Sequence, residues 1–307
     1  MKYAYIRAAV LALFCTGLIL PGCGRKKSAG KPVIFVSILP QAYFAERVAG
    51  DHVSVEVLAG PGQSPHSFEP TPKQMAKLAE ADVFFTIGIP FEKGFVHKIK
   101  SSNPRLKIVP TDTGITKRRM KTDRHHDEKE GHAHEKTYAA EHKGGADPHV
   151  WLDPVLVKGM AEIMCDTLSG LMPENKKTFR KNLDAFTRDL NDLDRKIADV
   201  LKPLRGRKFF VFHPAFGYFG DRYGLDQQAV EIEGKEPGAR QLARLTEEAK
   251  EEGVRVLFVQ PQFAKTSAAT VAQEIGGAVV PIDPLARNYI QNLTEMADTI
   301  KNSLQKE

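Results

Sequence analysis

The sequence predicts an α/β fold in which two similar lobes, each a parallel sheet flanked by helices, are joined by one long rigid helix. Short strand-like runs alternate with helical segments along the chain, and this alternation favours parallel sheets. Two five-residue strings recur in the same order in the two halves of the chain. Between the halves lies one long pattern of apolar residues at helical spacing. These three observations predict the fold class.

The first half contains the clearest strands and helices. Val33–Ile38 is a mostly apolar run, which is typical of a buried strand, and Val53–Leu58 alternates apolar with polar residues, as a half-buried strand does. A helix is expected around Tyr43–Val48, between these two strands. The remaining patterns of this half predict a helix over Thr71–Ala81 and strands over Asp82–Gly88 and Leu106–Pro110.

The second half repeats this plan. Tyr43–Arg47 (YFAER) matches Tyr218–Arg222 (YFGDR), and Ile108–Asp112 (IVPTD) matches Val279–Asp283 (VVPID). The offsets from 43 to 218 and from 108 to 279 are 175 and 171 residues, nearly equal, as expected when one α/β unit has been duplicated. Chance is the alternative for matches this short, but two matches in the same order favour duplication.

One long helix is predicted between the halves. Its apolar residues recur at steps of three and four, which is the pattern of an amphipathic helix. They are Phe179, Leu183, Phe186, Leu190, Leu193, Ile197 and Val200. Pro173 suits the first turn and Pro203 follows the end, which gives a rod about 43 Å long. The helix, over residues 173–202, separates an N-terminal lobe at 32–172 from a C-terminal lobe at 203–307.

The N-terminus predicts secretion. Residues 1–22 combine basic residues with an apolar run, Ala8–Leu20, that is shorter than the roughly 18–20 residues needed to span a bilayer. Leucine three residues before Cys23, with glycine directly before it, resembles a bacterial lipoprotein box. Lipidation of Cys23 would anchor the protein to a membrane through several acyl chains, with residues 23–31 as the tether. The alternative is an ordinary cleaved signal peptide in which Cys23 is incidental.

Composition excludes several classes of function. The formal charge is +6, but Lys2 and Arg7 contribute two of these charges, and the acid-free tether contributes the other four. The folded body is therefore neutral, whereas a nucleic-acid-binding protein needs a net-positive face on its folded domain. Of the three cysteines only Cys165 lies in the body, so the sequence offers neither an internal disulfide nor a thiolate metal site.

Residues 116–145 interrupt the α/β pattern. This stretch is almost wholly polar and cannot bury enough apolar area to order itself, so we expect a disordered surface insertion. Five of the ten histidines fall within it: His125, His126, His132, His134 and His142. Paired imidazoles bind divalent metals without a fold, so weak auxiliary metal binding is expected. Solvated imidazoles with no such role are the alternative.

Three other histidines, His66, His149 and His213, lie in loops rich in proline or glycine. His213 directly follows a predicted strand, and Asp283 directly follows another. Ligand sites of open α/β sheets lie beyond the carboxyl ends of the strands. Three neutral imidazoles and one carboxylate form a complete tetrahedral set for zinc, and imidazoles do not favour magnesium or calcium. Taken singly, each histidine has a purely structural alternative.

Five strings occur in a characteristic order: PHSFEPTPKQ, DPHVWLDP, HPAFGYF, VQPQF and IDPLA. In this order and spacing they resemble the metal-binding lipoproteins of bacterial ABC transporters, in their zinc branch, over about residues 32–305. The resemblance implies two α/β lobes joined by a backbone helix, with a metal in the cleft between them. It also implies metal ligation by His66, His149, His213 and Asp283. A histidine-rich loop between the first two ligands is typical of the zinc members.

One residue departs from the pattern of that family, and a second leaves the identity of the fourth metal ligand open. Some zinc members have an acid just before the first histidine, where this chain has Pro65. Asp283 matches Asp112 in the internal repeat, and Asp112 is not expected to bind metal. Water or a longer contact is therefore the alternative to Asp283 as fourth ligand. In manganese members the third ligand is usually a glutamate, so His213 favours the zinc branch.

The expected function is that of a high-affinity extracytoplasmic receptor that captures Zn²⁺ and delivers it to the permease of an ABC transporter. The protein is expected to act as a monomer without catalytic activity, on the periplasmic or extracellular face of the membrane that holds its lipid. We expect His66 and His149 to come from one lobe and His213 and Asp283 from the other, with Trp151 packed beneath the cleft. A manganese or iron receptor of the same class, a zinc hydrolase and an adhesin are the alternatives.

Overall fold

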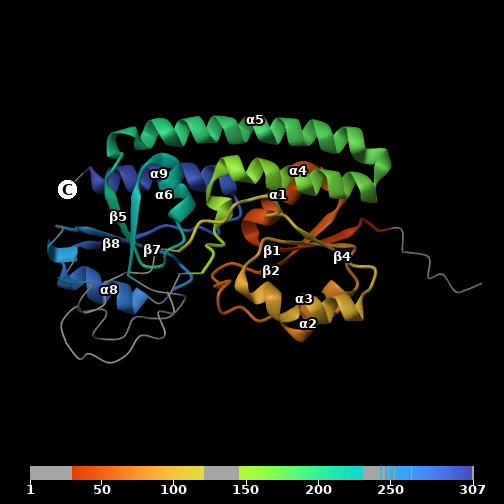
Figure 1. The fold of residues 1–307 in the computed structure, drawn as a ribbon, viewed down its shortest axis with the longest axis horizontal. Coiled ribbons are helices and arrows are strands. Elements are labelled where there is room, and N and C mark those ends of the chain that lie inside the picture. The colour runs from red at the N-terminus through yellow and green to blue at the C-terminus, as the bar shows by residue number, and fades with distance from the viewer. Residues whose placement is uncertain are drawn as a thin grey trace, which may run out of the picture. The chain divides into compact units, whose positions relative to one another are not determined.

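Two parallel four-stranded sheets form the centres of two lobes in the computed structural model (Figure 1). The first sheet has the strand order β2-β1-β3-β4 and the second has the order β6-β5-β7-β8. The strands are β1 (Val33–Ile38), β2 (Ser54–Ala59), β3 (Val83–Thr86), β4 (Lys107–Pro110), β5 (Lys208–Val211), β6 (Asp226–Ala229), β7 (Val256–Val259) and β8 (Ala278–Pro281). The shared strand order confirms the predicted pair of similar lobes.

The structure describes residues 30–120, 145–230 and 243–305, with short gaps at 244–245, 248, 252 and 264. Pro32–Glu307 forms one compact unit, and both lobes belong to it. The predicted signal peptide, Cys23 and the five histidines at 125–142 lie outside the described residues. None of the described helices combines the length and the apolar character needed to cross a membrane.

Helices lie on both sides of the sheets (Figure 1). Below the sheets in that view lie α2 (Pro72–Ala79), α3 (Pro90–Ser102) and α8 (Lys265–Glu274); above them lie α1 (Leu39–Ala49), α4 (Pro154–Leu171), α6 (Gly217–Tyr223) and α9 (Tyr289–Leu304). Proline occupies the first or second helical position of α1, α2, α3 and α4, where a missing N–H removes no helical hydrogen bond. The sequence pattern does not predict α3, because few residues of that helix are apolar and buried.

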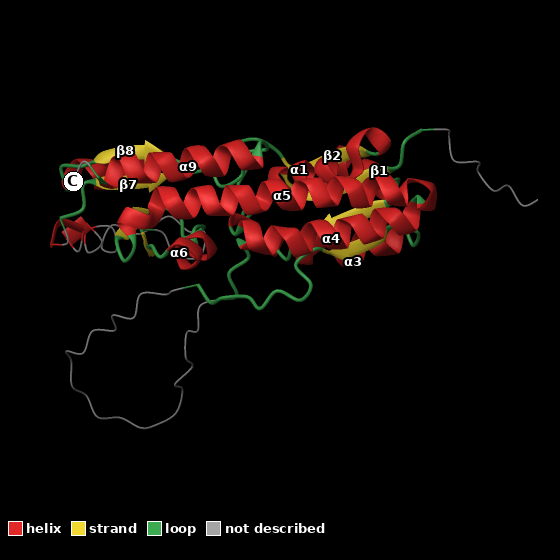
Figure 2. Cartoon of the chain, turned by 90° about the horizontal axis from the view of Figure 1, so that it is seen from above, coloured by secondary structure: helices red, strands yellow, loops and turns green. Residues whose placement is uncertain are grey.

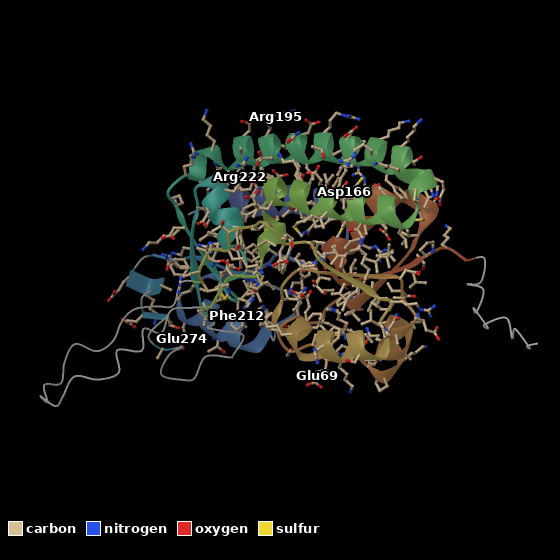
Figure 3. All side chains as sticks on the ribbon, turned by 45° about the vertical axis from the view of Figure 1, so that its right-hand side comes forward. Glu69, Asp166, Arg195, Phe212, Arg222 and Glu274 are labelled. Carbon is tan, nitrogen blue, oxygen red and sulfur yellow. The ribbon has the colours of Figure 1, made fainter. Side chains whose placement is uncertain are left out.

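The long helix α5 (Lys176–Leu201) runs along both lobes (Figures 1 and 2). It packs against α1 and α4 on one lobe and against α6 and α9 on the other. The predicted apolar positions from Phe179 to Ile197 are buried, whereas Arg195 lies on the outer side (Figure 3). This confirms the amphipathic helix, with one difference: Pro173–Asn175 forms a separate 3-10 turn before α5 begins.

Aromatic packing beneath α5 joins the two lobes. The ring of Phe44 on α1 meets Tyr289 on α9 edge to face, with 4.9 Å between centroids, and also packs against Phe186 of α5 at 5.9 Å. The Tyr289 hydroxyl donates to the carbonyl oxygen of Trp151 at 2.7 Å. Because all four residues are buried, these contacts hold the loops at the carboxyl ends of the two sheets opposite each other.

Candidate metal centre

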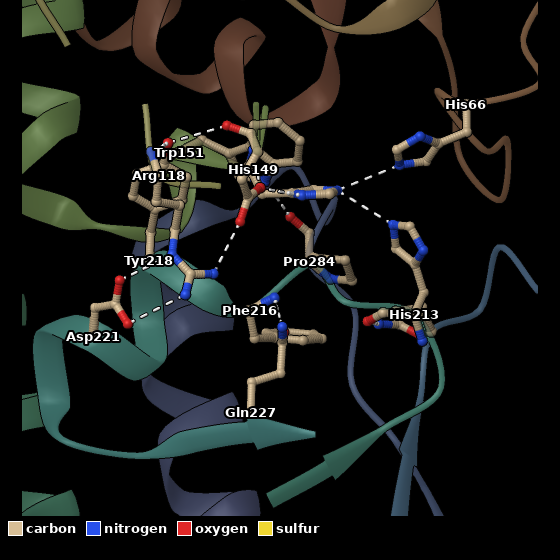
Figure 4. A network of polar contacts seen from close by, with 12 residues as sticks. His66, Arg118, His149, Trp151, His213, Phe216, Tyr218, Asp221, Gln227 and Pro284 are labelled. Carbon is tan, nitrogen blue, oxygen red and sulfur yellow. Dashed lines mark hydrogen bonds and ion pairs between the residues drawn. The ribbon is translucent and has the colours of Figure 1, made fainter. Parts of the chain in front are cut away.

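Three imidazoles meet between the lobes (Figure 4). Nε2 of His149 lies 3.4 Å from Nε2 of His66 and 3.3 Å from Nε2 of His213. Among the described residues these three form the one group of histidine, cysteine or acidic ligand atoms that all lie within 4.8 Å of one another. His149 and His213 are 3% and 2% exposed, and His66 is half-buried. The structure therefore brings together the three histidines that the sequence singles out.

The spacing of these nitrogens fits a tetrahedral zinc ion. Zinc–imidazole bonds are roughly 2.0–2.1 Å long, so two ligand nitrogens at the tetrahedral angle lie about 3.3 Å apart. The two Nε2 separations from His149, 3.3 and 3.4 Å, agree with that value. The donor set, three nitrogens without a thiolate, also suits zinc better than the oxygen-preferring cations.

The three histidines come from different parts of the fold. His66 lies in the loop after β2, where its backbone N–H donates to Oγ of Ser64 at 3.3 Å. His149 stands just before the 3-10 turn Val150–Leu152, which leads into α4. His213 follows β5 directly. The first two precede α5 in the chain and the third follows it.

A glutamine side chain fixes the backbone of His213. Oε1 of Gln260 accepts a hydrogen bond from the His213 N–H at 3.2 Å, and Nε2 of Gln260 donates to the His213 carbonyl oxygen at 2.7 Å. The ring of Phe263 stacks on the His213 imidazole, with 4.8 Å between centroids and an interplanar angle of 27°. These contacts orient His213, and the sequence string VQPQF contains both partners without revealing their roles.

A buried carboxylate orients His149. Oδ1 of Asp147 lies 2.7 Å from Nδ1 of His149 and also accepts the His149 backbone N–H at 3.0 Å. Burial opposes ionisation of Asp147, but the hydrogen bonds from His149 and the charge of Arg118 hold its pKa below the usual range. An ionised carboxylate only accepts, so Nδ1 bears the ring proton and the Nε2 lone pair is directed at the cluster.

Arg118 and Tyr218 tie Asp147 to the second lobe (Figure 4). Nη1 of Arg118 lies 3.1 Å from Oδ2 of Asp147, and its Nε lies 2.9 Å from Oδ2 of Asp221 on α6. The Tyr218 hydroxyl accepts the Arg118 N–H and donates to the Asp147 carbonyl oxygen, each at 3.0 Å. A Cβ at Gly217 would lie 1.3 Å from Arg118 Nη1, so any other residue there would displace the guanidinium from this position. We call Arg118, Asp147, Tyr218 and Asp221 the strap.

The strap involves one end of the predicted insertion at 116–145. Residues 116–120 and 145 are described, and Arg119 forms an isolated antiparallel bridge with Ala146. The Met120 N–H donates to the carbonyl oxygen of Gly145 at 3.0 Å. The two ends of the insertion therefore lie side by side, close to His149.

Trp151 packs beneath the cluster, as the sequence predicts. Its ring centroid lies 5.2 Å from that of His149, and its Nε1 donates to the carbonyl oxygen of Pro284 at 2.8 Å. Trp151 is 1% exposed. The buried indole therefore reports on the environment of His149.

Burial keeps the His66 imidazole neutral. Desolvation, with repulsion from His213 and His149 as lesser causes, lowers its pKa to about 3. A neutral ring offers its lone pair to a metal without first losing a proton. At neutral pH His66 is therefore ready to bind a cation.

Asp283 is not part of the histidine cluster. Its Oδ1 accepts hydrogen bonds from Nε2 of Gln262 at 2.8 Å and from the Leu285 N–H at 2.9 Å. Nδ2 of Asn292 donates to its carbonyl oxygen at 2.7 Å. Direct ligation by Asp283 therefore stays a prediction.

A small cavity of about 20 Å³ adjoins the three imidazoles. Its lining includes Trp151, Gln260 and Gln262 and excludes Asp283, which lines a separate neighbouring pocket with Gln262. A space of this size holds about one water molecule. It accommodates one ion or one ligand of the size of water.

The family model described as the periplasmic zinc-uptake complex component A, ZnuA, matches residues 34–303 of this chain. The chain belongs to this family. Membership confirms the resemblance indicated by the five sequence strings. The ZnuA fold also agrees with the observed architecture, in which one long helix joins two parallel-sheet lobes.

Proteins of similar sequence align with most of the chain. The zinc-binding lipoprotein AdcA of Streptococcus pneumoniae strain R6 is 31% identical in an alignment of 330 residues, which covers 100% of this chain and 62% of AdcA. This chain therefore spans about three fifths of the length of that relative. The high-affinity zinc uptake system protein ZnuA of Yersinia pestis is 28% identical, covering 94% of this chain and 92% of its own length. A crystal structure of ZnuA is 37% identical with a TM-score of 0.79, covering 89% of this chain and 99% of its own.

Proposed function

We propose that this protein is an extracytoplasmic receptor that captures Zn²⁺ with His66, His149 and His213 and delivers it to the permease of an ABC transporter. The main support is that Nε2 of His149 lies 3.3–3.4 Å from Nε2 of both other histidines, which is close to the separation expected of imidazoles on one tetrahedral zinc ion. Membership of the ZnuA family, and relatives named for zinc binding and zinc uptake, support the same substrate and the same kind of partner.

In this proposal zinc is the transported ion, and it links the two lobes while it is bound. His66 and His149 belong to the chain before α5, and His213 belongs to the lobe after it, so one ion linked to all three resists separation of the lobes. The permease then recognises the joined form. Release follows when the lobes part and the ion loses one or more imidazoles.

A binding role fits the site better than hydrolysis. A zinc hydrolase keeps an open position where both water and an organic substrate reach the metal. The cavity beside the imidazoles, at about 20 Å³, has room for about one water molecule. We therefore propose that the site binds an ion and performs no chemistry on an organic substrate.

The same proposal includes the envelope context. We propose that Cys23 is lipidated after removal of residues 1–22, that residues 23–31 form the tether, and that the receptor acts as a monomer. A relative named as a lipoprotein supports the anchor. We further propose that the five histidines at 125–142 form auxiliary weak metal sites. The lobe boundaries of the proposal are 32–172, 173–202 for the joining helix, and 203–307.

Zinc titration of the purified metal-free protein tests the proposed function. Competition with a chromophoric chelator should show one tight site, and saturating zinc should raise the temperature of thermal unfolding because the ion binds the folded state. His213→Ala should weaken the tight site by at least about a hundredfold, since it removes one of three imidazole ligands. Competition with manganese, iron, copper and nickel in the same assay measures selectivity.

His97→Ala is the matched control, since His97 is exposed on α3 away from the cluster. It should retain the affinity of the unmodified protein. A tight site that survives His213→Ala, or zinc that leaves the unfolding temperature unchanged at saturation, would show that the three imidazoles are not the receptor site.

A further inference from the structure

Two cavities meet at His66. One is the small cavity beside the imidazoles, and the other is a groove of about 550 Å³ on the first lobe, between the loop after β2 and the helix α3. His66 is the one residue that lines both. The groove has an apolar floor and two charged residues, namely Phe68, Met75, Phe91 and Phe95 with Glu69 and Lys98. Both charged residues are exposed, and Glu69 lies at the lower side of the molecule in Figure 3. The His66 imidazole therefore stands between the cluster and a groove that is open to solvent.

The other two imidazoles are firmly held. Nδ1 of His149 lies 2.7 Å from Oδ1 of the buried Asp147. His213 is 2% exposed, its backbone makes two hydrogen bonds with Gln260, and its ring stacks on Phe263. Rotation of either ring out of the cluster breaks these contacts and displaces buried neighbours, which is unfavourable. We therefore expect these two histidines to keep their places while a metal ion exchanges.

His66 is held more loosely. It is half-buried, and it reaches the cluster from a separate loop, away from the strap (Figure 4). Among the described residues Nδ1 of His66 has no hydrogen-bond partner, and the backbone N–H makes one hydrogen bond, to Oγ of Ser64 at 3.3 Å. The groove beside the ring is larger than an imidazole. His66 can therefore turn out of the cluster without displacing a buried side chain.

We infer that His66 is the gate of the zinc site, whose imidazole turns into the groove to let the ion pass while His149 and His213 stay in place. Zinc binds first to the two fixed imidazoles and is then enclosed by His66, and it leaves in the reverse order. This inference rests on the proposed zinc-binding function. It adds which of the three imidazoles is lost first and on which side of the site the ion travels.

The alternative route runs through the neighbouring pocket that contains Asp283. Gln262 and Leu285 line both that pocket and the small cavity, and so stand between them. Nε2 of Gln262 donates to Oδ1 of Asp283 at 2.8 Å, and the Leu285 N–H donates to the same oxygen at 2.9 Å. Passage on this side requires hydrogen-bonded residues to move, whereas passage past His66 requires one loosely held ring to turn.

Filling the groove tests the inference. Gly94 lines the groove on the same face of α3 as Phe91 and Lys98, and a Cβ added there would meet no atom within 4 Å. Gly94→Phe should slow both zinc binding and zinc release by about tenfold, and leave the dissociation constant within about threefold, because the ion crosses the same barrier in both directions. Stopped-flow mixing with Zn²⁺ and with excess chromophoric chelator measures the two rates. Unchanged rates in this variant would overturn the inference.

A double variant ties the effect of the groove to His66. His66→Ala removes a zinc ligand and the gate together, so the site becomes weaker and its path to the groove stays open. In that background Gly94→Phe should change both rates by less than about twofold, because no imidazole has to turn. Slowing that is equally large in the two backgrounds would show that His66 is not the gate.

Two further variants serve as controls. Gly159→Phe places the same side chain on an exposed position of α4, where an added Cβ also meets no atom within 4 Å, and should leave both rates as they are. Ala286→Phe narrows the pocket that contains Asp283 and should change both rates by less than about twofold. Slowing by Ala286→Phe without slowing by Gly94→Phe would place the route in that pocket and overturn the inference.

The outcomes separate this inference from the proposed function. Thermal unfolding of each metal-free variant shows whether it folds, so a folding defect is not counted as a change in exchange rate. If the unmodified protein had no tight zinc site, the proposed function would fail. If it had one and the folded Gly94→Phe variant exchanged zinc as fast as the unmodified protein, only the gate at His66 would fail.

Discussion

The two sheets share one strand order but differ at their carboxyl ends. In the first lobe Glu92 closes this edge: it accepts from the Ser37 hydroxyl at 2.5 Å and from the N–H groups of Ile87 and Gly88 at 2.9 and 2.8 Å. In the second lobe His213 stands at the equivalent edge and points its ring into a cluster of imidazoles. The polar groups at the first edge are hydrogen bonded to one another, whereas the second edge leaves nitrogen lone pairs available for a metal ion.

The rest of the two edges shows the same contrast. Gln41 of the first lobe accepts the Ser37 N–H at 3.0 Å and donates to the Phe85 carbonyl and the Thr111 hydroxyl, so its amide is fully engaged. Gln262 of the second lobe has a buried oxygen without a partner among the described residues. Asp112 pairs with Lys117 at 2.6 Å, whereas its repeat counterpart Asp283 holds Gln262. Two sheets with one strand order thus have different edges, and the site depends on which side chains end the strands.

The largest expected effect comes from Glu92, and it is a change of the free energy of unfolding with pH. Burial raises its pKa to about 7 from the ordinary 4.5, against the opposing hydrogen bonds from Ser37, Ile87 and Gly88. The folded state therefore keeps the proton to higher pH than the unfolded state, and this contribution to stability is lost as pH rises from about 4.5 to about 7. The loss is at most about 3.5 kcal/mol, because a pKa raised from 4.5 to about 7 corresponds to roughly 1.4 kcal/mol for each unit.

Urea unfolding of the metal-free protein at pH 4.5 and pH 7.5 measures this contribution. Glu92→Gln should flatten the pH dependence, while zinc affinity at neutral pH stays within about twofold because Glu92 lies outside the cluster. Glu80→Gln, at an exposed position after α2, is the matched control. Identical pH dependence in the Glu92→Gln variant and the unmodified protein, or a large loss of zinc affinity, would contradict the division of roles between the edges.

The next largest expected effect is a loss of zinc affinity when Asp147 is changed. Asp147→Asn keeps the size of the side chain but replaces an obligate acceptor, so the ring proton of His149 is no longer fixed on Nδ1. Zinc affinity should fall by about 10- to 100-fold, the usual loss when a partner of a ligating histidine is changed. Chelator competition measures the change.

Asp221→Asn is the comparison for that variant. Asp221 belongs to the same strap and also contacts Arg118, but its side chain is 64% exposed, so its charge is screened by solvent. We expect a change in zinc affinity of less than about threefold. Equal losses in the two variants would mean that the strap acts by holding the lobes together rather than by orienting His149.

Local patterns in the sequence were enough to predict the paired lobes, α5 and the three histidines. Strand runs, helical spacing and the five strings all lie within short windows, and the loops after β2 and β5 place their histidines by strand direction alone. The strap was not predictable, because Arg118 and Asp147 meet across a long polar segment and Asp221 lies in the other lobe. The unsatisfied oxygen of Gln262 is likewise a property of packing, which no spacing in the sequence reveals.

The smallest expected effect comes from the histidine-rich insertion, provided that the strap is left intact. Removing 121–144 and joining Met120 to Gly145 through a short glycine linker should leave the tight zinc site within about threefold, because those two residues are already hydrogen bonded at 3.0 Å. Total zinc stoichiometry should fall, since five histidines are removed.

A deletion of 117–143 removes the same histidines together with Arg118, and so leaves Asp147 without its guanidinium partner. This longer deletion should weaken the tight site by about tenfold relative to the shorter one, as loss of a charged hydrogen bond to a buried group does. Chelator competition measures the tight site in both deletions, and metal analysis after equilibrium dialysis measures the stoichiometry. Equal affinities in the two deletions would show that the strap residue Arg118 adds nothing to zinc affinity. Loss of the tight site in the shorter deletion would place a principal zinc ligand within 121–144.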